Sequence, residues 1–325
     1  MDDPLSRING FEAIDQEIAD LEARLRDAKL RRQQQQGTSP SAGPYSHQQQ
    51  QQHFLFLLSD SALPLGSFAF SSGLESFLAH DKAAAAASAS ASLAAAVNAL
   101  PKGMKSGPDA FAAFLPLSVS SYTHASLPFV LAAHDAASAI EPSSPASIDA
   151  FTAALTLLDD TYDATIICTV GRRASVAQGR ALLSIWERAF SPSLAATTTS
   201  DPLRPFARLV KKSSNPPPGV LSEASAHMPP LFGAVSALAG LDRRQTADVF
   251  VLSHVKALLS AAVRANLLGP YQAQRLLASA HVQRLAVQAV ESTWNVPVEE
   301  AGQAVPVVDL WMGRHEMLYS RIFNS

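Results

Sequence analysis

The sequence predicts an all-α fold, and three features of its composition and patterning point that way. Of its 325 residues, 47% are hydrophobic and only 15 are glycine, while alanine, leucine and serine dominate. The alternation of Val, Ile, Thr and Tyr that is typical of strands is nearly absent. Apolar residues instead recur at three- and four-residue steps, which is typical of amphipathic helices. A chain of this length can bury a sizeable core in one or two domains.

Composition also limits the classes of partner and compartment. The net charge of −3 and the pI near 6.3 argue against nucleic acid as an obligate partner. The single cysteine, Cys168, excludes an internal disulfide and favours a reducing compartment. Asp2 and Asp3 follow Met1 directly, so no signal peptide is expected. No apolar stretch reaches the roughly 20 residues that a bilayer requires. We therefore expect a cytoplasmic protein with no membrane segment.

The first 52 residues read as an extension outside the core. Residues 10–32 predict a short separate helix, because apolar side chains fall at 4-3-4 spacing with acidic residues early and basic residues late. Residues 33–52 are rich in glutamine, with a Pro/Gly/Ser patch. This composition predicts a disordered linker.

The first specific stretch, residues 53–75, predicts two helices joined by a rigid turn. Pro64 stops a helix that arrives from its N-terminal side, and Gly66 permits a turn that other residues make only at a cost. Phe68 and Phe70 lie beside this turn, which we call the elbow. From residue chemistry alone, two interpretations are equally good. The two rings either fill a corner of the core or are displayed for an interaction.

Two low-complexity stretches predict insertions between core helices. Residues 81–106 are nearly all Ala and Ser, so they favour helix but offer little apolar volume to bury. Residues 191–225 carry prolines that cannot sit in a helix interior, and they predict an irregular surface insertion. Between the two insertions, residues 109–117 and 127–139 predict packed helices punctuated by prolines.

Residues 148–190 carry the strongest helical periodicity in the first half of the chain. Gly171 is expected to bend or end the first helix of this stretch. Gly179 then lies inside a helical pattern, where glycine costs about 1 kcal/mol relative to alanine. Its benefit there is that a position without Cβ lets a neighbouring helix approach closely.

The last third of the chain contains the predicted central helix and an unusual tail. After His227, two prolines suit the first turn of a new helix. Residues 246–268 are nearly all apolar and predict the central core helix. Residues 306–325, which we call the tail, alternate aromatic and charged residues. Because chain ends normally fray, this pattern indicates a tail that is ordered by the fold or by a partner.

No catalytic or metal-binding constellation is present. The pair His315–Glu316 lacks the second histidine of HExxH, since Tyr319 stands in its place. The chain contains neither GxSxG nor GxxxxGK[ST], and no two histidines are four residues apart. We therefore predict no catalytic residues, no metal ligands, no tightly bound cofactor and no enzymatic activity.

Ordered sequence blocks resemble those of the UreF-type urease accessory proteins. They read LLSDSALPLGSFAFSSGLE, RRASVAQGRALL, HMPPLFG, SAAVRANLLGPYQAQRLL and PVVDLWMGRHEMLYSRIFNS. The resemblance spans residues 53–325 and looks fungal, with an N-terminal extension and low-complexity insertions. It implies a single UreF-type helical bundle over 53–325. Its structural motif residues would be Pro64, Gly66, Gly73, Gln178, Gly179, His227 and Gly233.

The resemblance also implies a function. Proteins of this type are homodimeric, non-enzymatic scaffolds that join the UreD/UreH-type protein to the UreG-type GTPase. The resulting complex, rather than the scaffold alone, handles nickel and delivers it into apo-urease. By carry-over from the elbow and tail blocks, the partner-binding residues would be Phe68, Phe70, Glu75, Arg314, His315, Glu316, Tyr319 and Arg321. One departure is Phe70, which replaces the usual tyrosine and lacks its hydroxyl.

Two other classes remain open from the sequence. One is an autonomous nickel metallochaperone that uses His315 or His227 at a dimer axis. The other is a helical scaffold unrelated to urease. Metal titration of the isolated protein separates the first from a partner-joining scaffold, and the effect of gene loss on urease activity tests the second.

Overall fold

The computed structural model describes residues 47–80, 107–141, 144–194, 201–213 and 222–324. The chain divides into a unit of residues 1–46 and a unit of residues 47–325, and only the second is described below. The described residues are helical with no strand, which confirms the all-α prediction. The predicted helix 10–32, most of the glutamine-rich linker and the insertion 81–106 lie outside the described residues.

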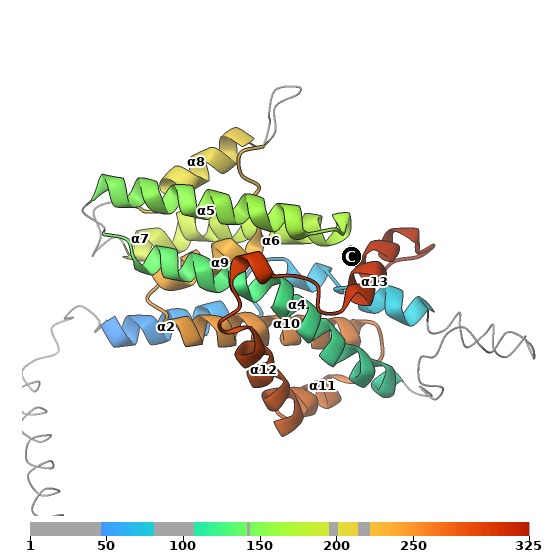
Figure 1. Cartoon of the computed structure of the whole chain (residues 1–325). Helices are drawn as coiled ribbons and strands as arrows, with labels where there is room; N and C mark the ends of the chain where they lie inside the picture. Colours follow the sequence, from blue (N-terminus) through green and yellow to red (C-terminus); the bar gives the residue numbers. More distant parts are fainter. Residues whose placement is uncertain (1–46, 81–106, 142–143, 195–200, 214–221, 325) are drawn as a thin grey trace, which may run out of the picture. The chain divides into compact units, whose positions relative to one another are not determined.

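Helices make up most of the described residues of the second unit (Figure 1). A further helical segment covers residues 74–80. The labelled elements are α2 (His47–Ser59), η1 (Ser67–Ala69), α4 (Gly107–Ser138), α5 (Pro145–Thr165), α6 (Thr169–Ile185), η2 (Trp186–Phe190), α7 (Ser191–Leu194), α8 (Arg204–Ser213), α9 (Met228–Leu238), α10 (Arg243–Arg264), α11 (Pro270–Leu277), α12 (Ala280–Thr293), η3 (Val298–Glu300), α13 (Pro306–Arg314) and η4 (His315–Met317).

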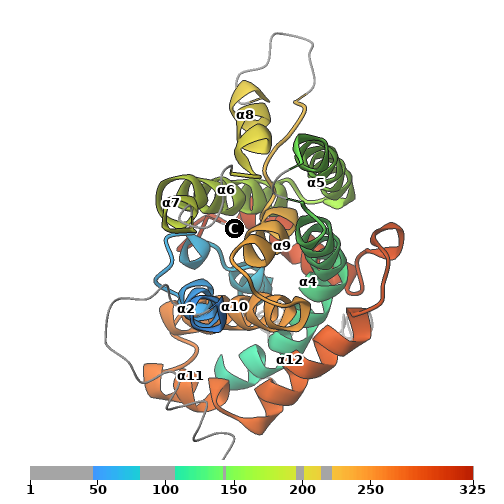
Figure 2. The same cartoon turned by 90° about the vertical axis from the view of Figure 1, so that its left-hand side faces the viewer.

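The core is built around α9, which lies between α6 and α10 and runs beside α4 (Figure 2). Nearly every residue of α9 is buried. Gly233 explains how closely α9 approaches α4, because a Cβ at this position would lie only 1.9 Å from the carbonyl oxygen of Val130. The predicted motif residue Gly233 is thus a packing residue.

The predicted central helix 246–268 corresponds to α10, although the observed helix begins three residues earlier, at Arg243. Asp242 starts it with a capping box, in which its side chain accepts the backbone N–H of Gln245. By length and composition α10 could cross a membrane, contrary to the expectation that no stretch reaches that length. However, 61% of the apolar window lies buried inside the fold. Burial in a core accounts for its apolar character.

Residues 47–52 correct the predicted domain boundary, because they belong to α2 rather than to the linker. Gln51 donates a hydrogen bond to Gln245 of α10 over 3.0 Å, and Phe54 and Leu58 are buried in the core. The glutamine run thus forms the first turns of α2, and the apolar residues that follow it anchor this helix in the core. Composition alone could not show this, since glutamine is a good helix former as well as common in linkers.

The two prolines predicted to punctuate residues 109–139 lie instead within one continuous helix, α4. A proline lacks the N–H that would bond the carbonyl four residues earlier. For Pro128 that carbonyl belongs to His124, and it accepts the backbone N–H of Gly302 at 3.3 Å instead. A long-range partner therefore satisfies the group that the proline leaves free.

Two further predictions need correction. The irregular insertion 191–225 contains a true amphipathic helix, α8, whose Phe206 and Val210 are buried while its basic residues face outward. The helix break within residues 148–190 falls before Gly171. Cys168 caps the start of α6, because its Sγ accepts the backbone N–H of Gly171 at 3.5 Å. Gly171 therefore lies in the first turn of α6 rather than at a bend.

Candidate functional site

The elbow has the sharp turn that the sequence predicts. Gly66 adopts φ 73°, in the left-handed region that favours glycine, and the 3-10 turn η1 follows it directly. Gly73 also has a positive φ of 86°, and it packs on α13, where a Cβ would lie 3.2 Å from the Met312 nitrogen. α2 ends at Ser59, so Pro64 lies in the turn itself. The elbow is therefore a rigid turn set against the C-terminal helix.

Glu75 connects the elbow to the tail. Its carboxylate accepts a hydrogen bond from the Nε2 of His315 at 2.8 Å. It also accepts the backbone N–H groups of Ile322 at 2.6 Å and Phe323 at 3.2 Å. We call this arrangement the Glu75 clamp. It joins positions that are as many as 248 residues apart in the sequence.

Further contacts hold the tail against the elbow (Figure 1). Phe323 is buried, and the guanidinium of Arg264 lies 4.5 Å from the centre of its ring. The same guanidinium donates a hydrogen bond to the Phe68 carbonyl. The backbone N–H of Asn324 donates to the carbonyl of Ala69 over 2.8 Å. The end of the chain is thus ordered by the fold, one of the two outcomes that its sequence pattern indicated.

The predicted partner-binding residues divide into two groups. Glu75 and His315 face inward, and His315 has no exposed surface. Both side chains hold the tail in place in this structure, and their direct contact with a partner stays a prediction. Phe70 is half-buried and lines a cavity. The other predicted residues are exposed, namely Phe68, Arg314, Glu316, Tyr319 and Arg321.

The elbow and tail display five large exposed apolar side chains, of which the sequence reasoning named Phe68 and Tyr319 but missed Leu310, Met317 and Ile322. Phe68 is 63% exposed, Met317 79% and Tyr319 fully exposed. Leu310 on α13 and Ile322 beside the clamp are exposed as well. We call these five residues the elbow–tail surface. The signal for it was present in the sequence as the alternation of aromatic and charged residues in the tail.

One charged contact borders the elbow–tail surface. Arg173 on α6 forms an ion pair with Glu316 of the tail, and both side chains are substantially exposed. Exposed pairs of this kind contribute about 0–1 kcal/mol to stability. The pair therefore orients the tail weakly compared with the buried clamp.

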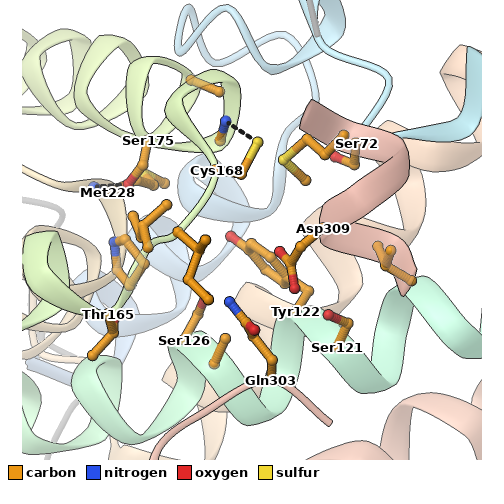
Figure 3. Close-up of a pocket in the computed structure, with 18 of the residues that line it drawn as sticks. Ser72, Ser121, Tyr122, Ser126, Thr165, Cys168, Ser175, Met228, Gln303 and Asp309 are labelled. Atoms are coloured by element: carbon orange, nitrogen blue, oxygen red, sulfur yellow. Dashed lines mark hydrogen bonds between the residues drawn. The ribbon is translucent and has the colours of Figure 1, made fainter. Parts of the chain in front are cut away.

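A cavity of about 390 Å³ lies between α4, α6, α13 and the loop around Gln303 (Figure 3). Asp309 and Tyr122 both line it. One carboxylate oxygen of Asp309 is buried and has no hydrogen-bond partner among the described residues. Burial raises the pKa of Asp309 above its usual range. The cavity thus contains one carboxylate, that of Asp309, among hydroxyl groups, two side-chain amides and apolar residues.

His254 forms part of the same cavity wall. Its ring stacks on Tyr122 with 3.9 Å between the ring centres, and its Nε2 lies 3.1 Å from the Ser118 hydroxyl. Burial lowers the pKa of His254 to about 3. The imidazole is therefore neutral at physiological pH and serves in packing.

A polar network ties the start of α9 to α5 and α6. Asp159 is buried, and its carboxylate accepts the backbone N–H groups of Ser225 and His227, each over 2.6 Å. The ring of His227 lies 3.1 Å from the hydroxyl of Ser175 and 2.7 Å from Asp163. These contacts fix the loop that leads into α9.

The Ser175–His227–Asp163 set contains the residue types of a hydrolase triad, but its geometry is that of a structural tie. The Ser175 oxygen accepts the backbone N–H of Met228 at 3.2 Å, and His227 has no exposed surface. Burial lowers the pKa of His227, although Asp159 and Asp163 oppose this shift. Burial acts to raise the pKa of Asp163. Hydrogen bonds from Arg172 and His227 outweigh this effect, so the pKa is lower than its usual value.

Gly179 allows the same loop to lie directly on α6. A Cβ there would come within 2.0 Å of the Ala226 carbonyl oxygen and 2.8 Å of the Met228 nitrogen. The structure shows the close approach predicted at Gly179, although it is the loop leading into α9 that approaches rather than a helix. Its neighbour Gln178 lines the cavity and bonds back to Ala174 within α6.

The described residues contain no group of three or more His, Cys, Asp or Glu side chains placed to hold a metal ion. The acidic and imidazole groups are instead distributed between the clamp, the α9 network and the cavity. The feature best placed for interaction is therefore the exposed elbow–tail surface.

Comparisons with known proteins give a consistent family. The family model for UreF matches residues 105–281. The chain is 32% identical over 277 residues to a Schizosaccharomyces pombe protein called "Uncharacterized urease accessory protein UreF-like", covering 85% of this chain and 98% of the relative. It is 27% identical to urease accessory protein 6 of Cryptococcus neoformans, covering 84% and 96%. It is also 27% identical to urease accessory protein F of Oryza sativa, covering 82% of each chain.

Proposed function

The chain belongs to the UreF family of urease accessory proteins, and we propose that it acts in urease maturation as a scaffold without enzymatic activity. In this proposal the scaffold is a cytoplasmic homodimer. It joins a UreD/UreH-type protein to a UreG-type GTPase, and the assembly docks on apo-urease. Nickel is cargo of the assembled complex rather than a resident ion of this chain.

The observation that carries the proposal is the elbow–tail surface. Isolated exposed apolar residues are ordinary, but a group displayed by two segments that the fold fixes together marks an interaction site. Tyr319 and Met317 extend from the tail, while Phe68 extends from the elbow. Arg314 and Arg321 supply charge beside them. Aromatic residues and arginine are the residue types that dominate protein–protein binding energy.

We assign this surface to an accessory-protein partner rather than to a small molecule. Its five residues are exposed and none of them lines the cavity between α4, α6 and α13, whereas small ligands bind in concave sites that cover most of their surface. Phe70, the one predicted elbow residue that faces the cavity, keeps an aromatic ring but has no hydroxyl to offer. Any partner contact at this position is therefore made by the ring alone.

The experiment that tests the maturation role is deletion of the gene followed by complementation. We expect urease activity to be lost at ordinary nickel supply, while the amount of urease polypeptide is unchanged. The intact gene should restore the activity. Unchanged activity after deletion would overturn the proposal and leave a helical scaffold unrelated to urease.

A separate measurement tests the place assigned to nickel. Equilibrium dialysis of the isolated protein against nickel should give only weak binding. Tight binding that is lost on replacing His315 or His227 by alanine would favour an autonomous metallochaperone instead.

A further inference from the structure

Residues 169–213 concentrate positive charge in a chain that is negative as a whole. They contain eight arginine or lysine residues and only two acidic residues, although the whole chain has a net charge of −3. Six of these basic residues are exposed on the C-terminal half of α6, on η2 and on α8. We call them the basic face: Arg180, Arg188, Arg204, Arg208, Lys211 and Lys212.

Hydrogen bonds and ion pairs bring the elements of the basic face together. The two lysines at the end of α8 pair with Glu187 of η2 over 2.8 Å and with Glu223 over 2.7 Å. Arg180 of α6 donates a hydrogen bond to the carbonyl of Ser225, two residues beyond Glu223, at 3.2 Å. Figure 2 shows α8 directly above α6. The six cations therefore belong to one surface.

The core and a hydrogen-bonded turn fix the position of α8. The helix packs into the core through Phe206 and Val210, so its basic residues lie on the opposite side. The turn before it is held by Asp201, which accepts hydrogen bonds from the ring nitrogen of Trp186 at 2.9 Å and from the backbone N–H of Leu203 at 3.1 Å. The body thus holds α8 as a support for an exposed row of cations.

The arginines and the lysines of the basic face differ in their partners. Both lysines form ion pairs with carboxylates of this chain, whereas none of the four arginines forms an ion pair with a described residue. Arg204 and Arg208 lie one helical turn apart on the exposed side of α8. A guanidinium binds a carboxylate through two parallel hydrogen bonds. The basic face therefore offers arginines in a setting that already binds carboxylates.

A membrane and a nucleic acid both fit the basic face poorly. Interfacial helices insert an apolar side into the bilayer, but the apolar side of α8 is buried in the core. Residues 169–194 and 201–213 expose no large apolar side chain. Glu187 and Glu223 lie among the cations and would repel a continuous line of phosphates. Separate carboxylates of a protein surface can instead pair with single arginines.

We propose that the basic face docks an acidic protein surface, whose aspartate and glutamate side chains pair with the arginines of α6, η2 and α8. The assignment of that surface to a member of the urease assembly rests on the proposed function. A scaffold that joins two partners needs two docking surfaces, and α8 lies far from α13 in Figure 1. The basic face supplies a second surface, and its charge accelerates encounter with an acidic partner.

The test is binding of a short, fluorescein-labelled peptide rich in Asp and Glu to the full chain, measured by fluorescence anisotropy. Added salt should weaken this binding, because it screens exposed charges. Arg204→Gln with Arg208→Gln should weaken it about fivefold, as loss of two exposed ion pairs predicts. The matched control is Arg275→Gln with Arg284→Gln, which removes two exposed arginines from α11 and α12 and changes the net charge equally. It should keep the wild-type affinity.

A further variant tests the same surface without altering α8. Arg188→Gln on η2 should also weaken peptide binding. The inference is overturned if the wild-type chain does not bind the peptide, or if both double variants lose the same affinity, since net charge alone would then explain binding. Tighter binding of a single-stranded oligonucleotide or of phosphatidylserine vesicles than of the peptide would also overturn it, because the partner would then not be a protein.

Capture of the urease assembly separates this inference from the proposed function. Weaker capture of one component by Arg204→Gln with Arg208→Gln, but not by the control pair, supports both. Wild-type capture by both pairs would mean that the assembly does not use the basic face, which overturns the inference and leaves the proposed function standing. If the wild-type chain captures no component, the proposed function fails, while the peptide measurement still decides whether the basic face binds acidic protein.

Discussion

At the residue scale, His254 links burial to a measurable pH dependence. The folded-state pKa is about 3, whereas the unfolded value is near 6.5. The unfolded chain therefore binds more protons than the folded chain between these two values, and stability rises with pH across this window. Burial also lowers the pKa of His227, so this residue likewise makes the folded state more stable as the pH rises.

We predict that acidification from pH 7 to pH 5 lowers the free energy of unfolding by about 2 kcal/mol through His254 alone. His254→Gln should reduce this pH dependence, because the amide keeps polar contact with Ser118 but does not titrate. Denaturant unfolding at both pH values measures the effect. The control is His281→Gln, an exposed position on α12, which should keep the wild-type pH dependence. An unchanged dependence in His254→Gln would contradict the assignment.

Asp309 gives a prediction of the opposite sign. Burial raises its pKa, so the stability it contributes is present below pH 3.8 and is lost as pH rises through the folded value. Asp309→Asn should therefore stabilise the protein slightly at pH 7, since a neutral amide replaces a carboxylate with an unpaired buried oxygen. Thermal unfolding at pH 7 compares the two chains. A lower melting temperature for the variant would show that the carboxylate has a stabilising partner.

Single residues were also where prediction from sequence worked best and worst. The left-handed turn at Gly66 and the close approach at Gly179 could be predicted, because each depends on one residue type in a local pattern. The inward role of Glu75 could not, because its partner Ile322 is 247 positions away. The exposure of Arg314, Glu316 and Arg321 agrees with their predicted role, which stays a prediction.

At the element scale, the main features are two close approaches to α9. Gly179 allows the loop before α9 to lie on α6, and Gly233 allows α9 to lie on α4. α9 is almost completely buried as a result. The cavity wall and the α9 network depend on this placement, since Met228 and Ser175 both line the cavity.

We predict that Gly179→Ala lowers the free energy of unfolding by about 1–3 kcal/mol or more, as for overpacked cores. The new methyl group would meet backbone atoms of Ala226 and Met228, which cannot move without shifting α9. Denaturant unfolding measures the loss. Gly302→Ala is the matched control, because a Cβ there meets nothing within 4 Å, and it should stay within about 0.5 kcal/mol of wild type. Equal stability of both variants would contradict the packing role.

The helices α4 and α8 show why the sequence predicted the helix boundaries only in part. The two prolines of α4 were expected to punctuate helices, yet α4 is continuous because Gly302 satisfies the carbonyl that Pro128 leaves free. α8 was expected to be irregular, yet its buried Phe206 and Val210 hold it as a helix. Long-range contacts decided both cases, and local propensity does not contain them.

At the scale of the whole described unit, the core is hydrophobic and a few buried polar groups hold loops and the tail in place. The clamp and the α9 network are the examples. Exposed large apolar side chains occur on the elbow and tail and also on other elements, such as Leu157 on α5 and Tyr271 on α11. The assignment of an accessory role therefore depends on membership of the UreF family rather than on this distribution.

The central claim is that the elbow–tail surface docks an accessory partner, and co-purification tests it most directly. The double variant Met317→Ser with Tyr319→Ser removes two exposed apolar side chains without touching the clamp. Its matched control is Tyr271→Ser, a similarly exposed residue on α11, which lies away from α13 in Figure 1. We predict that the double variant keeps the wild-type melting temperature but no longer captures the UreD/UreH-type protein, the GTPase and apo-urease, while the control captures them normally. Capture by the double variant at the wild-type level would contradict the account.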